Sequence, residues 1–432
     1  MTSQRRVAIT GLGVIGSVGI GRDAFWSALM AGRSGIRPVG AFDASALPVR
    51  IAGEAPDFNP RDHIRQRKAL KVMARDIQLA AACAAQAADD AGLAAGAEPP
   101  DRIGVTLGAG LICSTLDELG PTAAAAVADD GHVDLAAWGR DGLDLLFPLW
   151  LLKYLPNMLA SHITIFHDAQ GPSNSMTTGE AAGIHAIGES YRTIARGDAD
   201  AMLAGAAESK INPVSMVRYC LLDLATTTYN DSPERASRPF DAGRDGLVPA
   251  EGGGILVLEE LEQARRRGAA VYAEVTGYGA TADTDVGTSV SASGDRQAAA
   301  IRAALADAGL APGDIDHVQA QGVGTVAADL AEARAIREVF DTGAGGVPVS
   351  AVTCLTGHPA AGAGGMAAAV AALSVANAGI PGHVNYTEPD PECGLQSMVT
   401  ESEERPVQRV LVNTFSLVGQ NAALVVERVR DE

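Results

Sequence analysis

Aromatic residues and basic charge are scarce in this sequence of 432 residues. Phe, Trp and Tyr make up 4% of the chain, and 33 Lys and Arg are outnumbered by 52 Asp and Glu, which gives a formal net charge of −19. This excess of negative charge opposes binding to nucleic acid or to an anionic membrane surface. We therefore expect neither nucleic acid nor a membrane as a partner.

Long hydrophobic runs and paired cysteines are also missing. No segment approaches the roughly 18 uninterrupted apolar residues of a membrane span, and residues 1–6 carry no apolar targeting core. The five cysteines form no CxxC pair and no spacing typical of a zinc site. We expect reduced thiols in a cytoplasmic protein, with no metal and no cofactor.

Small and aliphatic residues are abundant instead, with 47% hydrophobic residues and 49 glycines. This composition suits closely packed α/β layers, and the chain exceeds the usual size of a single core. The order strand, loop, helix that opens the chain starts again at Tyr272. We therefore predict two similar halves, residues 1–258 and residues 259–432.

Residue patterns predict the main elements of both halves. The predicted strands are residues 7–10, 103–107, 163–166, 173–178, 198–205, 315–320, 347–352 and 410–413, with a closing segment at 422–429. The predicted helices are residues 23–31, 62–92, 147–162, 180–192, 295–309 and 328–340.

Residues 171–188 carry the clearest sign of a functional site. We predict a short buried strand, a turn at Gly179 and a helix that begins at Glu180. This layout presents one side chain at a pocket mouth, beside backbone N–H groups and the positive end of a helix. A nucleophile is expected there, but Glu180 cannot form a thioester.

Four further motifs indicate a family because they occur together at fitting separations. They are Gly183-Ile184-His185-Ala186-Ile187-Gly188, Ala204-Gly205-Ala206-Ala207-Glu208, Ser237-Arg238-Pro239-Phe240-Asp241 and Glu251-Gly252-Gly253-Gly254. With the elbow at Gly179 they resemble the condensing enzymes, the β-ketoacyl synthases of the thiolase fold. The resemblance implies an α/β protein of two similar βαβ halves in five layers, α-β-α-β-α.

A glycine pattern near the N-terminus has two interpretations. Gly11, Gly13 and Gly16 satisfy G-x-G-x-x-G, which is also the signature of a dinucleotide-binding loop. No helix directly follows the last glycine, and no acidic residue ends a second strand at the expected distance. We favour a core strand and loop, as in the resembling family.

The resemblance also implies where the reactive groups of a condensing enzyme would lie. Such an enzyme needs a cysteine that carries the acyl chain and two histidines that hold the thioester oxygen. In the family register Glu180 occupies the cysteine position, Gln321 the first histidine, His358 the second, and Thr353 an accompanying lysine. Three of these four positions have changed type, so we expect no active catalytic residue and regard His358 as a hydrogen-bonded core residue.

Three further residues, Asp329, Glu332 and Cys354, are close in sequence to these positions. Asp329 and Glu332 match acidic positions that follow the first histidine motif of the family. Cys354 could be proposed as a replacement nucleophile. We do not expect this role, because Cys354 is off the elbow and has no evident helix N-terminus to activate it.

Two loops complete the site that the resemblance implies. The loop after the strand at 103–107 would line the acyl tunnel and set chain length, through Leu111, Ile112, Ser114, Thr115 and Leu116. The last loop would be a gate, formed by Phe415, Ser416 and Leu417. The usual G-F-G-G gate has lost two flexible glycines and its aromatic residue here.

Two surface features bear on partners. A basic cluster is either a solvated helix face or a docking surface for an acidic acyl carrier protein, and it consists of Arg61, Arg65, Arg67, Lys68, Lys71 and Arg75. The apolar stretch at residues 147–166 is expected to extend a dimer surface beside the elbow strand.

Loss of the chemistry on a retained scaffold resembles the chain-length factors, or ketosynthase β subunits, of bacterial type II polyketide synthases. This implies a non-condensing subunit that pairs with a ketosynthase α subunit, completes the acyl tunnel and sets chain length. Acyl carrier protein would act mainly through the partner, and the altered elbow and gate favour a reduced or polyene product. Two alternatives stay open: a malonyl-carrier decarboxylase for priming, and a synthase with an unconventional nucleophile.

Overall fold

A mixed β-sheet runs through the whole molecule. The computed structural model describes residues 5–93, 98–284, 293–340 and 346–430. Residues 1–4, which belong to the N-terminal segment expected to carry no targeting core, lie outside the described residues. Within these ranges the strand order is β11-β10-β14-β15-β9-β1-β8-β7-β5-β6, with β2 beside β1. The strands of this sheet are β1 Val7–Gly16, β2 Gly19–Ile20, β5 Ile103–Gly108, β6 Ser173–Met176, β7 Ala201–Ser209, β8 Glu251–Glu260, β9 Ala273–Ala282, β10 His317–Gln319, β11 Val349–Ser350, β14 Arg409–Phe415 and β15 Gln420–Glu427.

Two short strand pairs and a set of helices surround this sheet. The pairs are β3 Arg37–Pro38 with β4 Ile51–Ala52, and β12 Gly379–Ile380 with β13 Glu403–Glu404. The helices are α1 Arg22–Met30, α2 Pro60–His63, α3 Arg75–Ala91, α4 Leu116–Ala125, α5 Leu135–Ala137, α6 Met158–His167, α7 Ala182–Arg196, α8 Pro213–Leu221, α9 Leu261–Arg266, α10 Asp295–Ala308, α11 Val326–Phe340, α12 Thr353–Thr356 and α13 Gly362–Asn377.

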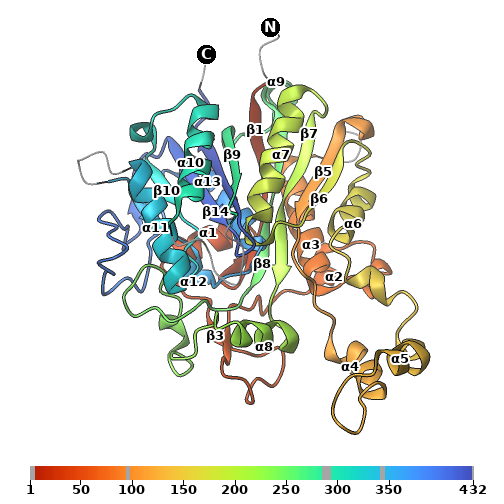
Figure 1. The fold of residues 1–432 in the computed structure, drawn as a ribbon. Helices are drawn as coiled ribbons and strands as arrows, with labels where there is room; N and C mark the ends of the chain where they lie inside the picture. The colour runs from red at the N-terminus through yellow and green to blue at the C-terminus, as the bar shows by residue number, and fades with distance from the viewer. Residues whose placement is uncertain (1–4, 94–97, 285–292, 341–345, 431–432) are drawn as a thin grey trace.

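Helices and strands alternate in five layers, α-β-α-β-α (Figure 1). α3 packs on β1, β7 and β8, and α10 packs on β9 and β15, while α7 and α13 lie between the two sets of strands. α13 is apolar around its circumference because both of its faces are covered. This arrangement confirms the predicted thiolase-like α/β fold. The two sheet layers are also continuous, since β1 pairs with β8 and, over Val7–Ile9, with β9.

The glycine pattern of the N-terminus lies inside β1 and not in a loop. A Cβ atom at Gly11 or Gly13 would overlap the backbone of α3, at Ala87 and Cys83 respectively. The glycines therefore allow α3 to pack directly on the strand, which is the structural interpretation favoured above. β1 is longer than the predicted strand at residues 7–10 and continues to Gly16.

Three predictions around the elbow were wrong. Residues 163–166 belong to α6 and not to a strand, because Leu159 and Ile163 face the core from the same side of a helix. The predicted helix at 62–92 is broken into α2, a 3-10 turn at Ala69–Val72 and α3. β6 is partly exposed instead of buried, because it pairs with β5 on one side and, within the described residues, with no strand on the other.

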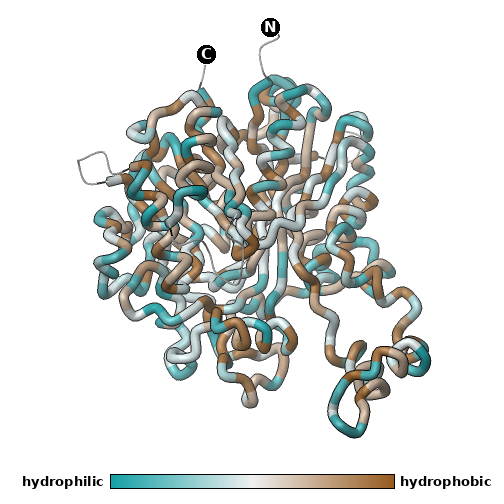
Figure 2. The backbone as a smooth tube through the Cα atoms, in the orientation of Figure 1, coloured by the Kyte–Doolittle hydropathy of each residue, from teal (hydrophilic) through white to brown (hydrophobic). Residues whose placement is uncertain are grey.

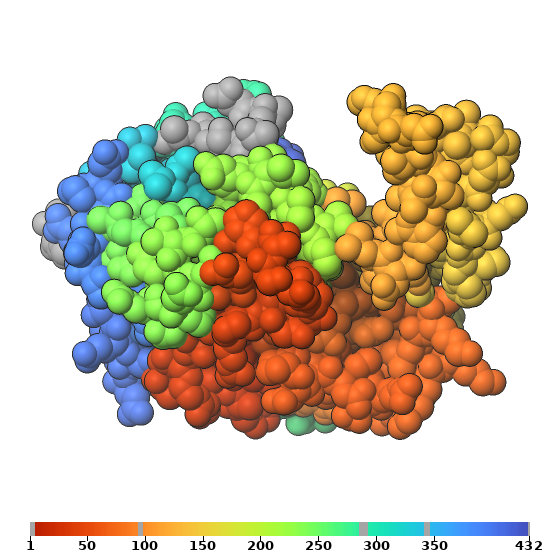
Figure 3. All heavy atoms as spheres, turned by 90° about the horizontal axis from the view of Figure 1, so that it is seen from below, coloured from red at the N-terminus to blue at the C-terminus, as the bar shows by residue number. Residues whose placement is uncertain are grey.

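Residues 111–156, here called the arm, stand away from the body of the molecule (Figures 1 and 3). The arm contains α4 and α5, and Figure 2 shows hydrophobic stretches along it. Its exposed apolar side chains are Leu111, Leu116, Val127, Val133, Leu135, Leu143, Leu145, Phe147, Leu149 and Leu151. This is a larger exposed apolar surface than scattered single side chains would give.

Among the residues that the model describes, no helix combines the length and the hydropathy needed to cross a membrane.

Candidate active site

The elbow is a tight turn between β6 and α7. Gly179 has a φ of 61°, in the region that favours glycine, and a 3-10 turn at Gly179–Ala181 precedes the helix. A Cβ atom at Gly179 would overlap the hydroxyl of Ser416 in the predicted gate loop. Glu180 therefore lies directly under this loop, and its Oε2 accepts a hydrogen bond from the N–H of Leu417 at 3.3 Å.

The positions of the two family histidines lie side by side. Gln321, which is buried, accepts a hydrogen bond from the N–H of Phe415 through Oε1 at 2.6 Å. Its Nε2 therefore faces His358, whose Nε2 is 3.2 Å away. Because the amide nitrogen can only donate, His358 Nε2 must accept. Burial lowers the pKa of His358, although the charge of Glu180 opposes this shift, so the ring is neutral at neutral pH.

The two substituted positions share one structural role. Glu180 binds the backbone of the gate loop at Leu417, and Gln321 binds it two residues earlier, at Phe415. Both bonds hold the loop down on the elbow. The site residues that the sequence predicted are therefore brought together, but as a closed set of hydrogen bonds rather than an open pocket.

Beneath these residues lies a buried frame of charges. Glu332 accepts hydrogen bonds from the N–H groups of Gln321 and Gly322, at 2.8 and 2.9 Å, and from the side chain of Asn413 at 2.8 Å. Burial raises the pKa of Glu332 to about 7, against the effect of these hydrogen bonds. The carboxylate holds the strand ends on which the candidate site is built.

Asp329 forms the second part of this frame. It accepts from the N–H groups of Phe240 and Gly324, at 2.8 and 2.9 Å, and lies 3.5 Å from the guanidinium of Arg244. Burial raises the pKa of Asp329 to about 6, although the hydrogen bond from Phe240 and the charge of Arg244 both oppose the shift. Arg244 also pairs with Asp390 at 2.7 Å.

Thr353 and Cys354 take no part in nucleophilic chemistry in this geometry. The Thr353 hydroxyl donates to the carbonyl groups of Gln321 and Gly322, at 3.0 and 2.6 Å, so it braces the same strand end. Cys354 is fully buried, and burial raises the pKa of its thiol to about 12. A thiol with that pKa holds almost no thiolate at neutral pH.

Sequence reasoning missed a buried group of charges beside Glu180. Lys210 forms an ion pair with Glu208, and their side chains are 9% and 2% exposed. Tyr219 and Asp76 are buried nearby, and burial together with Glu208 raises the pKa of Asp76 to about 7. The available signal was a lysine next to the A-G-x-x-E motif, within a stretch of small and apolar residues.

The predicted tunnel residues lie where the body meets the arm. Ile112 is buried, Ser114 is half-buried, and Leu111, Thr115 and Leu116 are exposed. The N–H of Thr115 donates to the hydroxyl of Tyr154 at 3.4 Å. Leu111, Thr115 and Leu116 thus present their side chains to solvent, while Ile112 packs into the core.

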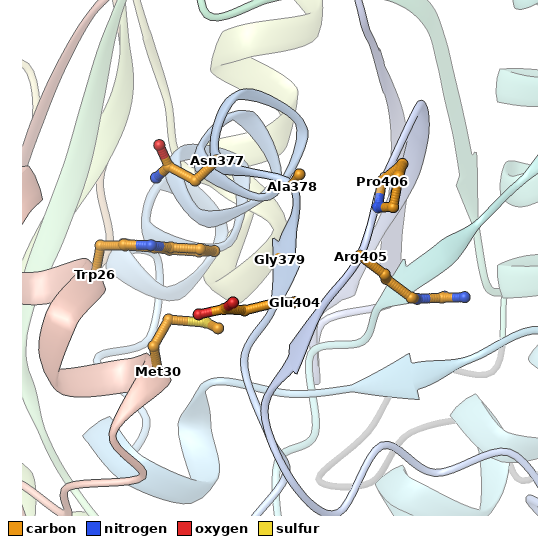
Figure 4. A pocket seen from close by; sticks show the side chains of 8 residues that line it. All are labelled: Trp26, Met30, Asn377, Ala378, Gly379, Glu404, Arg405 and Pro406. Carbon is orange, nitrogen blue, oxygen red and sulfur yellow. The ribbon is translucent and has the colours of Figure 1, made fainter.

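A surface pocket of about 490 Å³ lies elsewhere, between α1 and the β12–β13 pair (Figure 4). It contains the ring of Trp26, the side chain of Met30 and the charged residues Glu404 and Arg405. None of the predicted site residues lines it. No group of three or more His, Cys, Asp or Glu side chains in the described ranges is placed to hold a metal ion.

Two sequence families account for most of the chain. Residues 4–264 match the β-ketoacyl synthase N-terminal domain, and residues 272–387 match the β-ketoacyl synthase C-terminal domain. The chain belongs to the β-ketoacyl synthase family. A relative in this family, 3-oxoacyl-[acyl-carrier-protein] synthase 2 of Coxiella burnetii, is 35% identical over 428 residues, which cover 99% of this chain and 100% of the relative.

Solved structures of β-ketoacyl synthases include neighbours from polyketide assembly. The ishigamide ketosynthase/chain length factor matches with a TM-score of 0.85 and 31% identity over 99% of this chain and 100% of that chain. A type II polyketide synthase acyl-carrier protein in complex with its ketosynthase bound to the hexaketide matches with a TM-score of 0.82 and 27% identity, with the same two coverages. Both likenesses extend over the elbow, the gate loop and the arm.

Proposed function

We propose that this chain is the non-condensing β subunit of a type II polyketide ketosynthase, a chain-length factor that pairs with a ketosynthase α subunit. The observation that carries the proposal is the closed hydrogen-bond set at the family's reactive positions. Glu180 and Gln321, which occupy the positions of a thiol and an imidazole, each bind the backbone of the gate loop.

This geometry opposes both steps of a condensation. A carboxylate at the elbow cannot accept an acyl group from a thioester to form the stable thioester intermediate that a cysteine forms. Decarboxylation of a malonyl thioester needs donors at its carbonyl oxygen while an enolate develops. His358 Nε2 already accepts from Gln321 and therefore cannot donate there.

The arm and the edge strand β6 support a paired subunit. Both present surfaces to solvent that the described residues do not cover, and β6 leads directly into the elbow. The likeness to a ketosynthase/chain length factor and to a ketosynthase in complex with its acyl-carrier protein supports a ketosynthase α subunit as the partner. The five unpaired cysteines support a cytoplasmic location.

The acyl tunnel would begin at the cysteine of the α subunit and end in this chain, at residues 111–116. The acyl carrier protein would dock mainly on the partner, because the net charge of this chain is −19. A reduced or polyene product is proposed on the basis of the altered elbow and gate.

Reconstitution tests the pairing and the inactivity together. The chain alone, the α subunit alone and the mixture are supplied with malonyl carrier protein, and condensed products, released carbon dioxide and acylated protein are measured. We expect products only from the mixture and no acyl group on this chain. Carbon dioxide released by this chain alone would instead indicate a priming decarboxylase.

One alternative has its own support, since the curated relatives are named as condensing synthases. A synthase with an unconventional nucleophile would take up an acyl group, which the intact mass of the isolated chain reveals. Cys354→Ser is the matched control, because loss of that acylation in this variant would identify the thiol. We expect neither acylation nor an effect of the substitution.

Chain-length control is tested in the same mixture with Ser114→Phe and Thr115→Trp. Each added ring occupies volume that the distal carbons of the product would fill, so products should become shorter while the pair still forms. Ser45→Phe adds a ring on the exposed loop between β3 and β4 and serves as the control. Unchanged product lengths in both tunnel variants would place the chain-length determinant elsewhere.

A further inference from the structure

Lys210 is the one strongly buried lysine whose role the family comparison leaves unexplained. Its ammonium pairs with Glu208 and also donates to the carbonyl oxygen of Leu111 at 3.1 Å. Burial opposes its positive charge, but Glu208, Tyr219 and Asp76 outweigh this effect and raise its pKa above the ordinary value. The residue is therefore a permanent cation inside the molecule.

We propose that Lys210 is a positioning residue for chain-length control, which fixes the loop at residues 109–112 and thereby the end of the acyl tunnel. The inference rests on the proposed function. It adds a residue outside the predicted lining, on the far side of that loop.

Contacts on both sides of the loop support this role. A Cβ atom at Gly110 would overlap the carboxylate of Glu208, so the loop backbone lies directly against the ion pair. Glu208 is in turn held by the N–H of Ala361, which donates to its Oε2 at 2.8 Å. The ion pair thus connects the loop to the segment that follows His358.

A second contact holds the far part of the same loop. The hydroxyl of Ser215, in the first turn of α8, donates to the sulfur of Cys113 at 3.2 Å. Ser215 itself is fixed by Asn212, which caps the helix. Between the points held by Lys210 and Ser215 only Ile112 intervenes, and its side chain is buried. The segment that runs from β7 into α8 therefore holds the loop at two points, Leu111 and Cys113.

Two apolar side chains of similar volume could stand in place of Lys210 and Glu208, because a buried ion pair contributes little net stability compared with such side chains. What the pair adds is a charge-assisted bond to one particular carbonyl group, that of Leu111. Loss of the lysine alone leaves Glu208 buried without its cation, which lowers stability, and it also removes the bond that holds the loop at Leu111.

Deuterium uptake by the isolated chain tests the positioning step without any partner. Lys210→Met keeps the aliphatic stem and removes the donor, so uptake by the peptide covering residues 107–115 should become about tenfold faster, as expected for a lost charge-assisted bond. Lys210→Arg retains charge and donors and should restore slow uptake. Unchanged uptake in Lys210→Met would overturn the inference.

Product analysis in the reconstituted pair tests the specificity step. We expect Lys210→Met to change the ratio of adjacent product lengths about tenfold or more, with Lys210→Arg close to the original ratio and pairing intact. Arg267→Met is the matched control, because Arg267 also pairs with a buried glutamate, Glu259, and donates to a backbone carbonyl, that of Ala91, away from the loop. It should leave the ratio unchanged.

A second perturbation guards against misfolding of the lysine variant. Gly110→Ala displaces the same loop from the Glu208 side and should also alter both uptake and product ratio. Faster uptake with an unchanged product ratio in both variants would overturn the role in chain length. If the unaltered pair makes no product at all, the proposed function fails, and the uptake result alone then reports on the loop.

Discussion

The reactive positions and the frame beneath them differ in what they keep. At the surface of the site, Glu180, Gln321 and Thr353 are all of a different type from the residues that a condensing enzyme uses. One layer below, Glu332 and Asp329 still hold the strand ends through buried hydrogen bonds from four N–H groups. On the proposed function, the reactive groups have changed type and the buried acidic residues remain.

This difference indicates that the frame and the reactive positions above it have different structural roles. The frame satisfies backbone groups that folding has buried, so removal of a carboxylate leaves several donors without a partner. Above the frame, Glu180 accepts one hydrogen bond from the N–H of Leu417, and Gln321 accepts one from the N–H of Phe415. Removal of a frame carboxylate should therefore cost more than a substitution at Glu180 or Gln321, and the pH dependence of Glu332→Gln tests the charge of the frame separately.

The largest effect is expected from Asp329→Ala. It leaves the guanidinium of Arg244, whose side chain is 1% exposed, without one of its two carboxylates, and it orphans two N–H groups. Loss of one partner from a buried pair costs about 3–5 kcal/mol. Urea denaturation measures this cost. A loss below about 1 kcal/mol would mean that the frame carries little of the stability.

Gln321→Leu should have the next largest effect. The substitution removes the acceptor of the Phe415 N–H and the donor to His358, both of which are buried. Unsatisfied buried polar groups cost about 1–3 kcal/mol. Urea midpoints are compared with those of Gln321→Glu, which keeps the acceptor. Equal stability of the Leu variant and the original protein would contradict the role assigned to Gln321.

A smaller effect is expected in the pH dependence of Glu332→Gln. Glu332 has a folded-state pKa of about 7 against an ordinary 4.5, so the folded protein keeps this proton longer than the unfolded chain. The stabilisation is complete below the ordinary value and is lost as the pH rises through about 7, about 1 kcal/mol of it between pH 6 and pH 8. The variant should lack this decline, and parallel profiles of unfolding free energy would refute the assignment.

Glu180→Ala should have the smallest effect. Glu180 is half-buried and its hydrogen bond from the N–H of Leu417 is 3.3 Å long, so the loss of unfolding free energy should stay below about 1 kcal/mol. Glu180→Cys alone should not create condensation, since missing oxyanion donors cost about 100- to 1,000-fold each. Products made by Glu180→Cys without a partner would show that the frame alone suffices for catalysis.

Motif spacing predicted the architecture and the core of the site well. The register of the motifs predicted a strand, a turn and a helix around Gly179, and it singled out Gln321, His358, Asp329 and Glu332, which the structure brings close together. These features depend on local patterns that are read along the chain. The resemblance to the β-ketoacyl synthases could be recognised from those local patterns alone.

The remaining features depend on contacts between distant segments. Residues 163–166 alternate like a strand, yet Leu159 and Ile163 share a helical face that packs into the core. The polar segment Ser173–Met176 gives no sign that it would be an edge strand. Lys210 was missed because only the fold brings it to Leu111, 99 residues earlier in the chain.

The position of β1 has a consequence for how the chain folds. β1 begins at Val7, but its neighbours β8 and β9 begin at Glu251 and Ala273. At a synthesis rate of about 5–20 residues per second, roughly ten to fifty seconds separate the first strand from its partners. The backbone N–H and C=O groups along most of its length have no strand partner during that interval and are open to wrong pairings. Closure of this long loop, rather than formation of any helix, should limit the rate of folding.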